Sequence, residues 1–258
     1  MSILEIVAGL LRRAARSLLR RPGLSIVALM TLGLGIGANT AIFSIVNVVL
    51  LEPLPFKDPE RLVMVWSTAA NQGLTEGGSS YPDFDDWRAQ STAFDGLAAF
   101  WTFPNGDVNL TGGAEPQRVS VARVSTGFFE VLGVAPLHGR TFHADESVAG
   151  NHRRAILSYG LWHGQFGGDS TLVGRSVTVN GFPYEVVGIM PPQLQSRSVR
   201  VLGTDVQLWR PLVPDDNQTG GRDERKLRVV GRLSDGVTLR RAESELTAVA
   251  ARLAEIYP

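Results

Sequence analysis

The hydrophobic pattern of the chain is dominated by one long apolar stretch near the N-terminus. Residues 22–51 contain no charged side chain. About 20 apolar residues suffice to cross a bilayer core as a helix, so the pattern predicts a transmembrane helix over residues 22–51. A cleaved signal peptide remains an alternative, although its apolar core is usually about 7–15 residues and ends at a small-residue cleavage site. A helix buried in a soluble core is the other alternative.

The segment before this stretch predicts a different kind of helix. In residues 1–21, apolar residues recur at helical spacing between arginines, as in an amphipathic helix that lies on a membrane surface. Arginines beside a span keep that end in the cytoplasm. We therefore expect a cytoplasmic amphipathic helix over residues 1–21, with residues 52–258 on the outer side of the membrane. A single long helix with a kink at Pro22 is the alternative.

Small and polar residues inside the apolar stretch indicate helix partners. Gly33, Gly37 and Ala41 repeat every four residues, a spacing that lets two helices approach closely in lipid. Asn39 and Asn47 are polar, and they cost free energy where they face lipid. We expect these five residues to pack against other transmembrane helices, which must come from another chain or from a longer version of this one.

The remaining pattern alternates short strands with short helices. Period-two runs predict strands, apolar residues at helical spacing predict helices, and Gly, Pro and Asn separate them. Asn180-Gly181 between two β-rich runs predicts a hairpin. The predicted helices span residues 81–90, 125–133, 159–166 and 239–256. The predicted strands span residues 61–67, 97–103, 107–111, 117–124, 154–158, 175–180, 182–189, 206–212 and 227–233. The fold class is therefore α+β.

Charge and cysteine content exclude several function classes. The chain has 258 residues, no cysteine and a net charge of zero. Residues 1–21 hold five arginines against Glu5, a charge of +4, so the remainder carries −4. Membrane orientation accounts for this basic cluster, so we expect no nucleic-acid partner. The absence of cysteine excludes disulfides, thiolate metal sites and a cysteine nucleophile.

Candidate chemistry is sparse. The four histidines (His138, His143, His152 and His163) form no metal-binding pair at i,i+4, and exposure or packing explains them better. The acidic residues Asp83, Asp85 and Asp86 fit the start of a helix better than a cation site. Ser158 has no recognisable base partner. We therefore assign no catalytic, cofactor-binding or metal-binding residue, and we expect the protein not to be an enzyme.

A family resemblance rests on motifs spread along the chain. The runs LGIGANTAIFSIVN at 34–47, LLEPLPF at 50–56 and DPERL at 58–62 resemble ABC-transporter permeases of the MacB/FtsX-like type. Further matching stretches are YPDFDDWR at 81–88, FFEVLGV at 128–134, LSYGLW at 157–162, FGGD at 166–169 and VGIMP at 187–191. Within that group the chain looks most like the large duplicated permeases that lack a fused ATPase.

This resemblance implies a domain organisation. Residues 52–258 would form a MacB-like periplasmic core domain with two mixed α/β lobes. The membrane-proximal lobe would comprise about residues 60–95 and 225–258, and an inserted strand-rich lobe would comprise about residues 96–222. The family's other transmembrane helices follow this domain, so we expect the sequence to be the first part of a longer permease.

The resemblance also implies a function. The expected role is that of a permease subunit in an ABC-type efflux or mechanotransmission system that couples a separate ATPase to motion of the extracytoplasmic domain. The implied partners are that ATPase, transmembrane helices of the same or a second permease, a periplasmic adaptor and membrane lipid, and no cofactor is implied. The alternatives are a membrane-anchored extracytoplasmic binding or sensing domain and, with less support, a hydrolase. The sequence does not identify a substrate.

Overall fold

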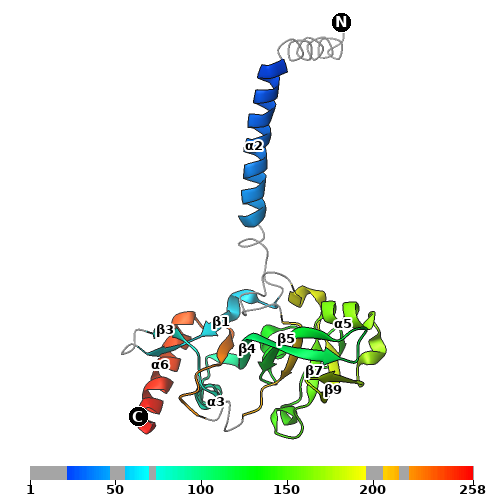
Figure 1. Ribbon diagram of the computed structural model, residues 1–258. Helices are drawn as coiled ribbons and strands as arrows, with labels where there is room; N and C mark the ends of the chain where they lie inside the picture. Colours follow the sequence, from blue (N-terminus) through cyan, green and yellow to red (C-terminus); the bar gives the residue numbers. More distant parts are fainter. Residues whose placement is uncertain (1–21, 47–55, 70–73, 196–205, 215–220, 258) are drawn as a thin grey trace. The chain divides into compact units, whose positions relative to one another are not determined.

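The computed structural model describes residues 22–46, 56–69, 74–195, 206–214 and 221–257. The chain divides into two compact units, residues 1–52 and 53–258. The described part of the first unit is α2 (Pro22–Val46), a helix of 25 residues (Figure 1). Within the described ranges, no helix is both long and apolar enough to cross a membrane, so the predicted transmembrane helix over residues 22–51 is not confirmed. The predicted helix over residues 1–21 lies outside the described residues, as do residues 47–51.

The second unit mixes helices and strands, which confirms the predicted mixed α/β character. Its α-helices are α3 (Tyr81–Gln90), α4 (Phe128–Leu132), α5 (Tyr159–Phe166) and α6 (Leu239–Ile256). Its 3-10 helices are η2 (Pro59–Arg61), η4 (Ala144–Ser147), η5 (Ser170–Leu172) and η6 (Pro192–Gln195). Its strands are β1 (Leu62–Val65), β2 (Ser67–Ala69), β3 (Leu74–Gly77), β4 (Phe94–Thr111), β5 (Gln117–Val124), β6 (His138–Gly139), β7 (Arg154–Leu157), β8 (Ser176–Val179), β9 (Phe182–Ile189), β10 (Leu208–Pro211) and β11 (Arg228–Leu233).

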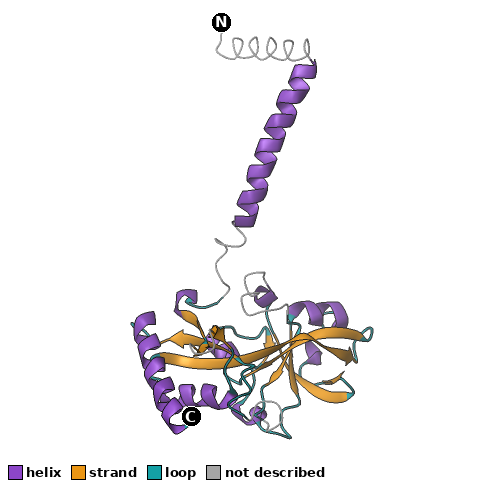
Figure 2. Cartoon of the chain, turned by 60° about the vertical axis from the view of Figure 1, so that its left-hand side comes forward, coloured by secondary structure: helices purple, strands orange, loops and turns teal. Residues whose placement is uncertain are grey.

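One large sheet organises this unit. Among the described residues, nine strands form it in the order β1-β11-β4-β5-β10-β7-β9-β6, with β8 paired to β4 and β9. The β5–β10 and β7–β9 pairs are parallel. Strands β2 and β3 form a separate two-stranded ribbon. Strands distant in sequence therefore lie side by side, as β1 and β11 do (Figures 1 and 2).

Helices cover both faces of the sheet. At the β1–β11–β4 end, α3 and α6 bury Phe84, Trp87, Val249 and Leu253 against one face. The opposite face packs against α4, whose Phe128, Phe129, Val131 and Leu132 contact sheet residues such as Trp209 and Val230. Further along the first face, α5 contributes Leu161 and Trp162 to a separate apolar cluster. The face that carries α3 and α6 thus has two apolar clusters with a stretch of sheet between them.

Local sequence signals predict the bounds of several helices and strands. The structure places α3, α5, α6, β5 and β9 at the predicted residues. Ser80 caps α3 by accepting a hydrogen bond from the Asp83 amide at 3.1 Å. In the predicted hairpin, Asn180 and Gly181 have φ values of 49° and 82°, as a type I′ turn requires.

Some strands differ from the prediction: the strand expected at 61–67 is divided between η2, β1 and β2. The separate strands expected at 97–103 and 107–111 are parts of β4, a continuous strand of 18 residues. Its pairing with β5 shifts register between Thr102 and Asp107, so an irregularity within the strand replaces the expected loop. The proposed division into two lobes stays a prediction.

Candidate functional site

A groove lies between the edge strand β1 and helix α6. Its volume is about 970 Å³, and its apolar lining includes Val63, Val65, Leu246 and Ala250. Strand β1 pairs with β11 on one side, and among the described residues it is the last strand at this end of the sheet. Helix α6 buries Ala242, Val249 and Leu253, whereas Leu246 lines this groove.

Charged residues line one end of the groove. The Arg222 guanidinium lies 2.6 Å from Asp83 and 2.6 Å from Asp86 of α3, and it stacks on the Tyr257 ring with 3.8 Å between the guanidinium carbon and the ring centroid. Burial pulls the pKa of Arg222 down, but hydrogen bonds to Asp86 and Asp83 outweigh burial and raise it. Arg222 therefore links α3 to the end of α6. The third acidic residue, Asp85, pairs with Arg88.

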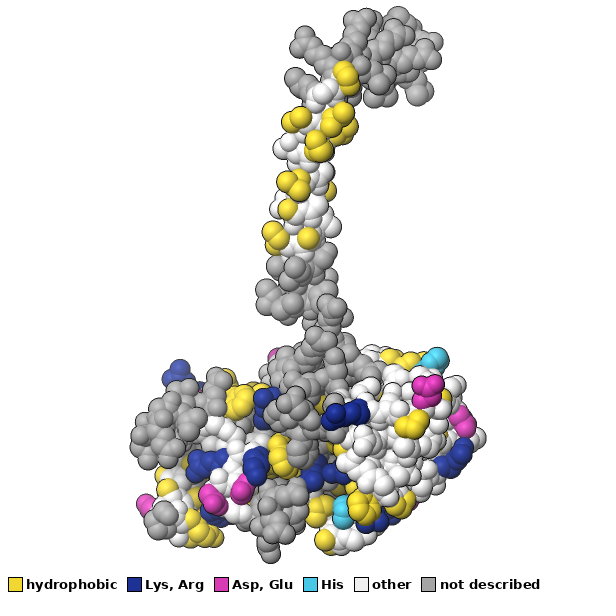
Figure 3. Space-filling view, viewed as in Figure 1, with side chains coloured by type: hydrophobic (Ala, Val, Ile, Leu, Met, Phe, Trp, Pro, Cys, Tyr) yellow, Lys and Arg dark blue, Asp and Glu magenta, His cyan; other side chains and the backbone are white. Residues whose placement is uncertain are grey.

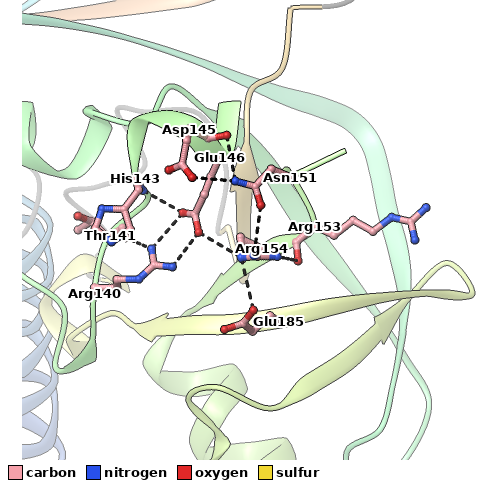
Figure 4. Close-up of polar contacts among 9 residues, drawn as sticks. All are labelled: Arg140, Thr141, His143, Asp145, Glu146, Asn151, Arg153, Arg154 and Glu185. Atoms are coloured by element: carbon pink, nitrogen blue, oxygen red, sulfur yellow. Dashed lines mark hydrogen bonds and ion pairs between the residues drawn. The ribbon is translucent and has the colours of Figure 1, made fainter. Parts of the chain in front are cut away.

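A buried carboxylate organises the loop between β6 and β7 (Figure 4). The Glu146 side chain is only 3% exposed, and its oxygens accept hydrogen bonds from Arg140 at 2.7 and 3.0 Å. Arg154 Nε donates to the same carboxylate at 3.1 Å and lies 3.5 Å from Glu185 on β9. The His143 amide donates at 2.9 Å. The loop is thereby bound to two neighbouring strands.

Electrostatics hold Glu146 in its charged form. Burial alone would raise its pKa, but the hydrogen bonds from Arg140 and the His143 amide, together with the charges of Arg140 and Arg154, lower the pKa below its usual value. These groups neutralise one another, so we assign the network a structural role.

Two arginines attach the start of the second unit to the sheet. Arg61 donates to the Leu233 carbonyl at 2.9 and 2.6 Å and pairs with Asp95 at 2.5 Å. Arg232, which is buried, donates to the Val131 carbonyl at 2.8 Å and to the Asp58 carbonyl at 3.3 Å. Residues 58–61 are thus bound to β11 and to the start of β4, and Arg232 also contacts α4. We call these two side chains the lead-in arginines.

The predicted helix-packing residues lie along α2, where hydrophobic side chains are exposed (Figure 3). A Cβ atom added at Gly33 or Gly37 would meet nothing within 4 Å, and Asn39 and Ala41 are exposed. Asn47 lies outside the described residues. The structure therefore places four of these residues on one helix, and their role in helix packing stays a prediction.

The histidines and Ser158 have structural neighbours. His138 contacts the Trp162 ring at 5.3 Å between centroids, and His163 stacks on Tyr159 at 5.7 Å. His143 caps η4, and His152 accepts a hydrogen bond from the Gly150 amide. Ser158 is buried, and its hydroxyl caps α5. Within the described part of the chain, no cluster of three potential ligands could hold a metal ion.

The sequence analysis did not predict the ion pairs of the second unit. Nothing in the spacing of Arg140, Glu146 and Arg154 distinguishes a buried carboxylate from an exposed one. Arg222 and its partners on α3 are more than 130 positions apart. Such pairs depend on how strands and loops are arranged in space, so a local pattern carries no signal for them.

Comparisons place this architecture among known proteins. A family model described as MacB-like periplasmic core domain matches residues 25–249. No curated protein gives a significant match. Among solved structures, the periplasmic region of MacB from Actinobacillus actinomycetemcomitans superposes with a TM-score of 0.56 and 16% sequence identity, and the match covers 76% of this chain and 87% of that chain.

A second solved structure has the same architecture. The extracellular domain of the noncanonic ABC-type transporter YknZ from Gram-positive bacteria gives a TM-score of 0.53 at 13% identity. This match covers 75% of the present chain and 95% of the other. At such low identity, the two superpositions establish a shared fold.

Proposed function

Because the chain belongs to the family of MacB-like periplasmic core domains, we propose that it is the N-terminal portion of an ABC-transporter permease subunit that transmits motion from a separate ATPase. The family match over residues 25–249 is the observation that carries the proposal. In this proposal residues 22–51 cross the bacterial inner membrane, residues 1–21 lie at its cytoplasmic surface, and residues 52–258 are periplasmic or otherwise extracytoplasmic. The role is efflux or mechanotransmission.

A separate ATPase is part of this proposal, and the family match supports it. The sequence contains no phosphate-binding loop of the form G-x-x-x-x-G-K-[ST]. Gly33, Gly35 and Gly37 cluster, but they lie within a helix and lack the following lysine. In the proposal, ATP binding and hydrolysis belong to a partner subunit. A periplasmic adaptor is a further proposed partner.

The lead-in arginines give this role a physical basis. Residues 58–61 come shortly after the proposed span, and Arg61 and Arg232 bind them to β11, to Asp95 and to the end of α4. Hydrogen bonds to charged groups are stronger than neutral ones. A displacement applied to these residues would therefore move the sheet as a body rather than unravel its first strand.

Disrupting helix packing tests the proposal. In Gly37→Arg, a charge replaces a small residue on the proposed packing face, and charges within a membrane are costly. We expect chemical crosslinking and mass spectrometry of native membranes to recover an ABC-type ATPase with the unchanged chain and at least tenfold less with the variant.

Val148→Arg is the matched control, because Val148 is 59% exposed in the second unit. This variant should recover the ATPase normally, and both variants should retain the folded second unit, as judged by resistance to limited proteolysis. Equal recovery of the ATPase with Gly37→Arg, or no ATPase with the unchanged chain, would contradict the proposal.

The groove favours a second candidate function. A volume of about 970 Å³ is at the upper end of the range for small-molecule sites. A membrane-anchored extracytoplasmic binding or sensing domain would use such a groove and would need no ATPase. The same crosslinking experiment separates the two candidates, since only the permease should recover an ATPase.

A further inference from the structure

We draw no further inference here: the strongest candidate, the apolar groove between the edge strand β1 and helix α6, carries none because nothing in the described part of the chain shows what covers it.

Discussion

Glu146 holds the loop between β6 and β7 through four hydrogen bonds, of which three come from arginine side chains. Arg222 makes a similar link between α3 and the end of α6. In both places a charged side chain links parts of the fold that lie apart in the sequence. At the residue scale, ion pairs therefore act beside apolar contacts, since α3 and α6 share one apolar cluster and Phe142 of the β6–β7 loop belongs to another.

Replacement of Glu146 tests this role. Glu146→Gln leaves Arg140 and Arg154 without their shared counter-ion, so we expect the free energy of unfolding at pH 7 to fall by about 3 kcal/mol. Asp85→Asn removes only the exposed pair with Arg88 and should cost less than about 1 kcal/mol. Urea unfolding of the three proteins measures both values. Equal losses in the two variants would refute the structural role of Glu146.

The effect of Glu146→Gln on the free energy of unfolding should depend on pH. The folded-state pKa of Glu146 lies below the ordinary value of 4.5, so its contribution is complete above that value and is lost as the pH falls through the folded-state pKa. The difference in unfolding free energy between the unchanged chain and Glu146→Gln should be constant above about pH 5 and shrink in more acidic solution. A difference that grows on acidification would contradict the assignment.

At the scale of elements, sequence signals succeed where structure is local. Capping by Ser80, Ser158 and Thr238 and the Asn180-Gly181 turn are set by neighbouring residues, and α3, α5, α6 and β9 match their predictions. β4 departs from its prediction because pairing with β5 continues on both sides of a register shift. The order of strands, with β10 parallel to β5, depends on contacts distant in sequence.

Gly181 tests the turn that defines the β8–β9 hairpin. Its φ of 82° lies in the left-handed region, so Gly181→Ala should lower the free energy of unfolding by about 1–2 kcal/mol. Gly164 in α5 is the control, since a Cβ there meets nothing within 4 Å and the backbone is helical. Gly164→Ala should be neutral or slightly stabilising. Thermal unfolding measures the stability of both variants. An unchanged free energy of unfolding in Gly181→Ala would exclude the type I′ turn.

At the scale of the whole molecule, family membership and fold agree. The family match spans residues 25–249, and two solved extracytoplasmic domains share the architecture. Membrane anchoring by residues 22–51 rests on the uncharged sequence and the arginines before it. We propose that the second unit lies outside a membrane to which residues 22–51 anchor the chain.

Single-cysteine labelling tests on which side of the membrane the second unit lies, because the chain contains no cysteine of its own. Val148→Cys places a thiol at a position 59% exposed in the second unit, and Ala155→Cys, fully buried, is the control for folding. Ser17→Cys marks the expected cytoplasmic side. We predict that an impermeant maleimide labels Val148→Cys in cells with an intact cytoplasmic membrane. Ser17→Cys should be labelled only after lysis. The labelled chain should stay with the membrane after alkaline extraction. Labelling of Val148→Cys only after lysis, or release of the labelled chain by alkali, would rule out this placement of the second unit.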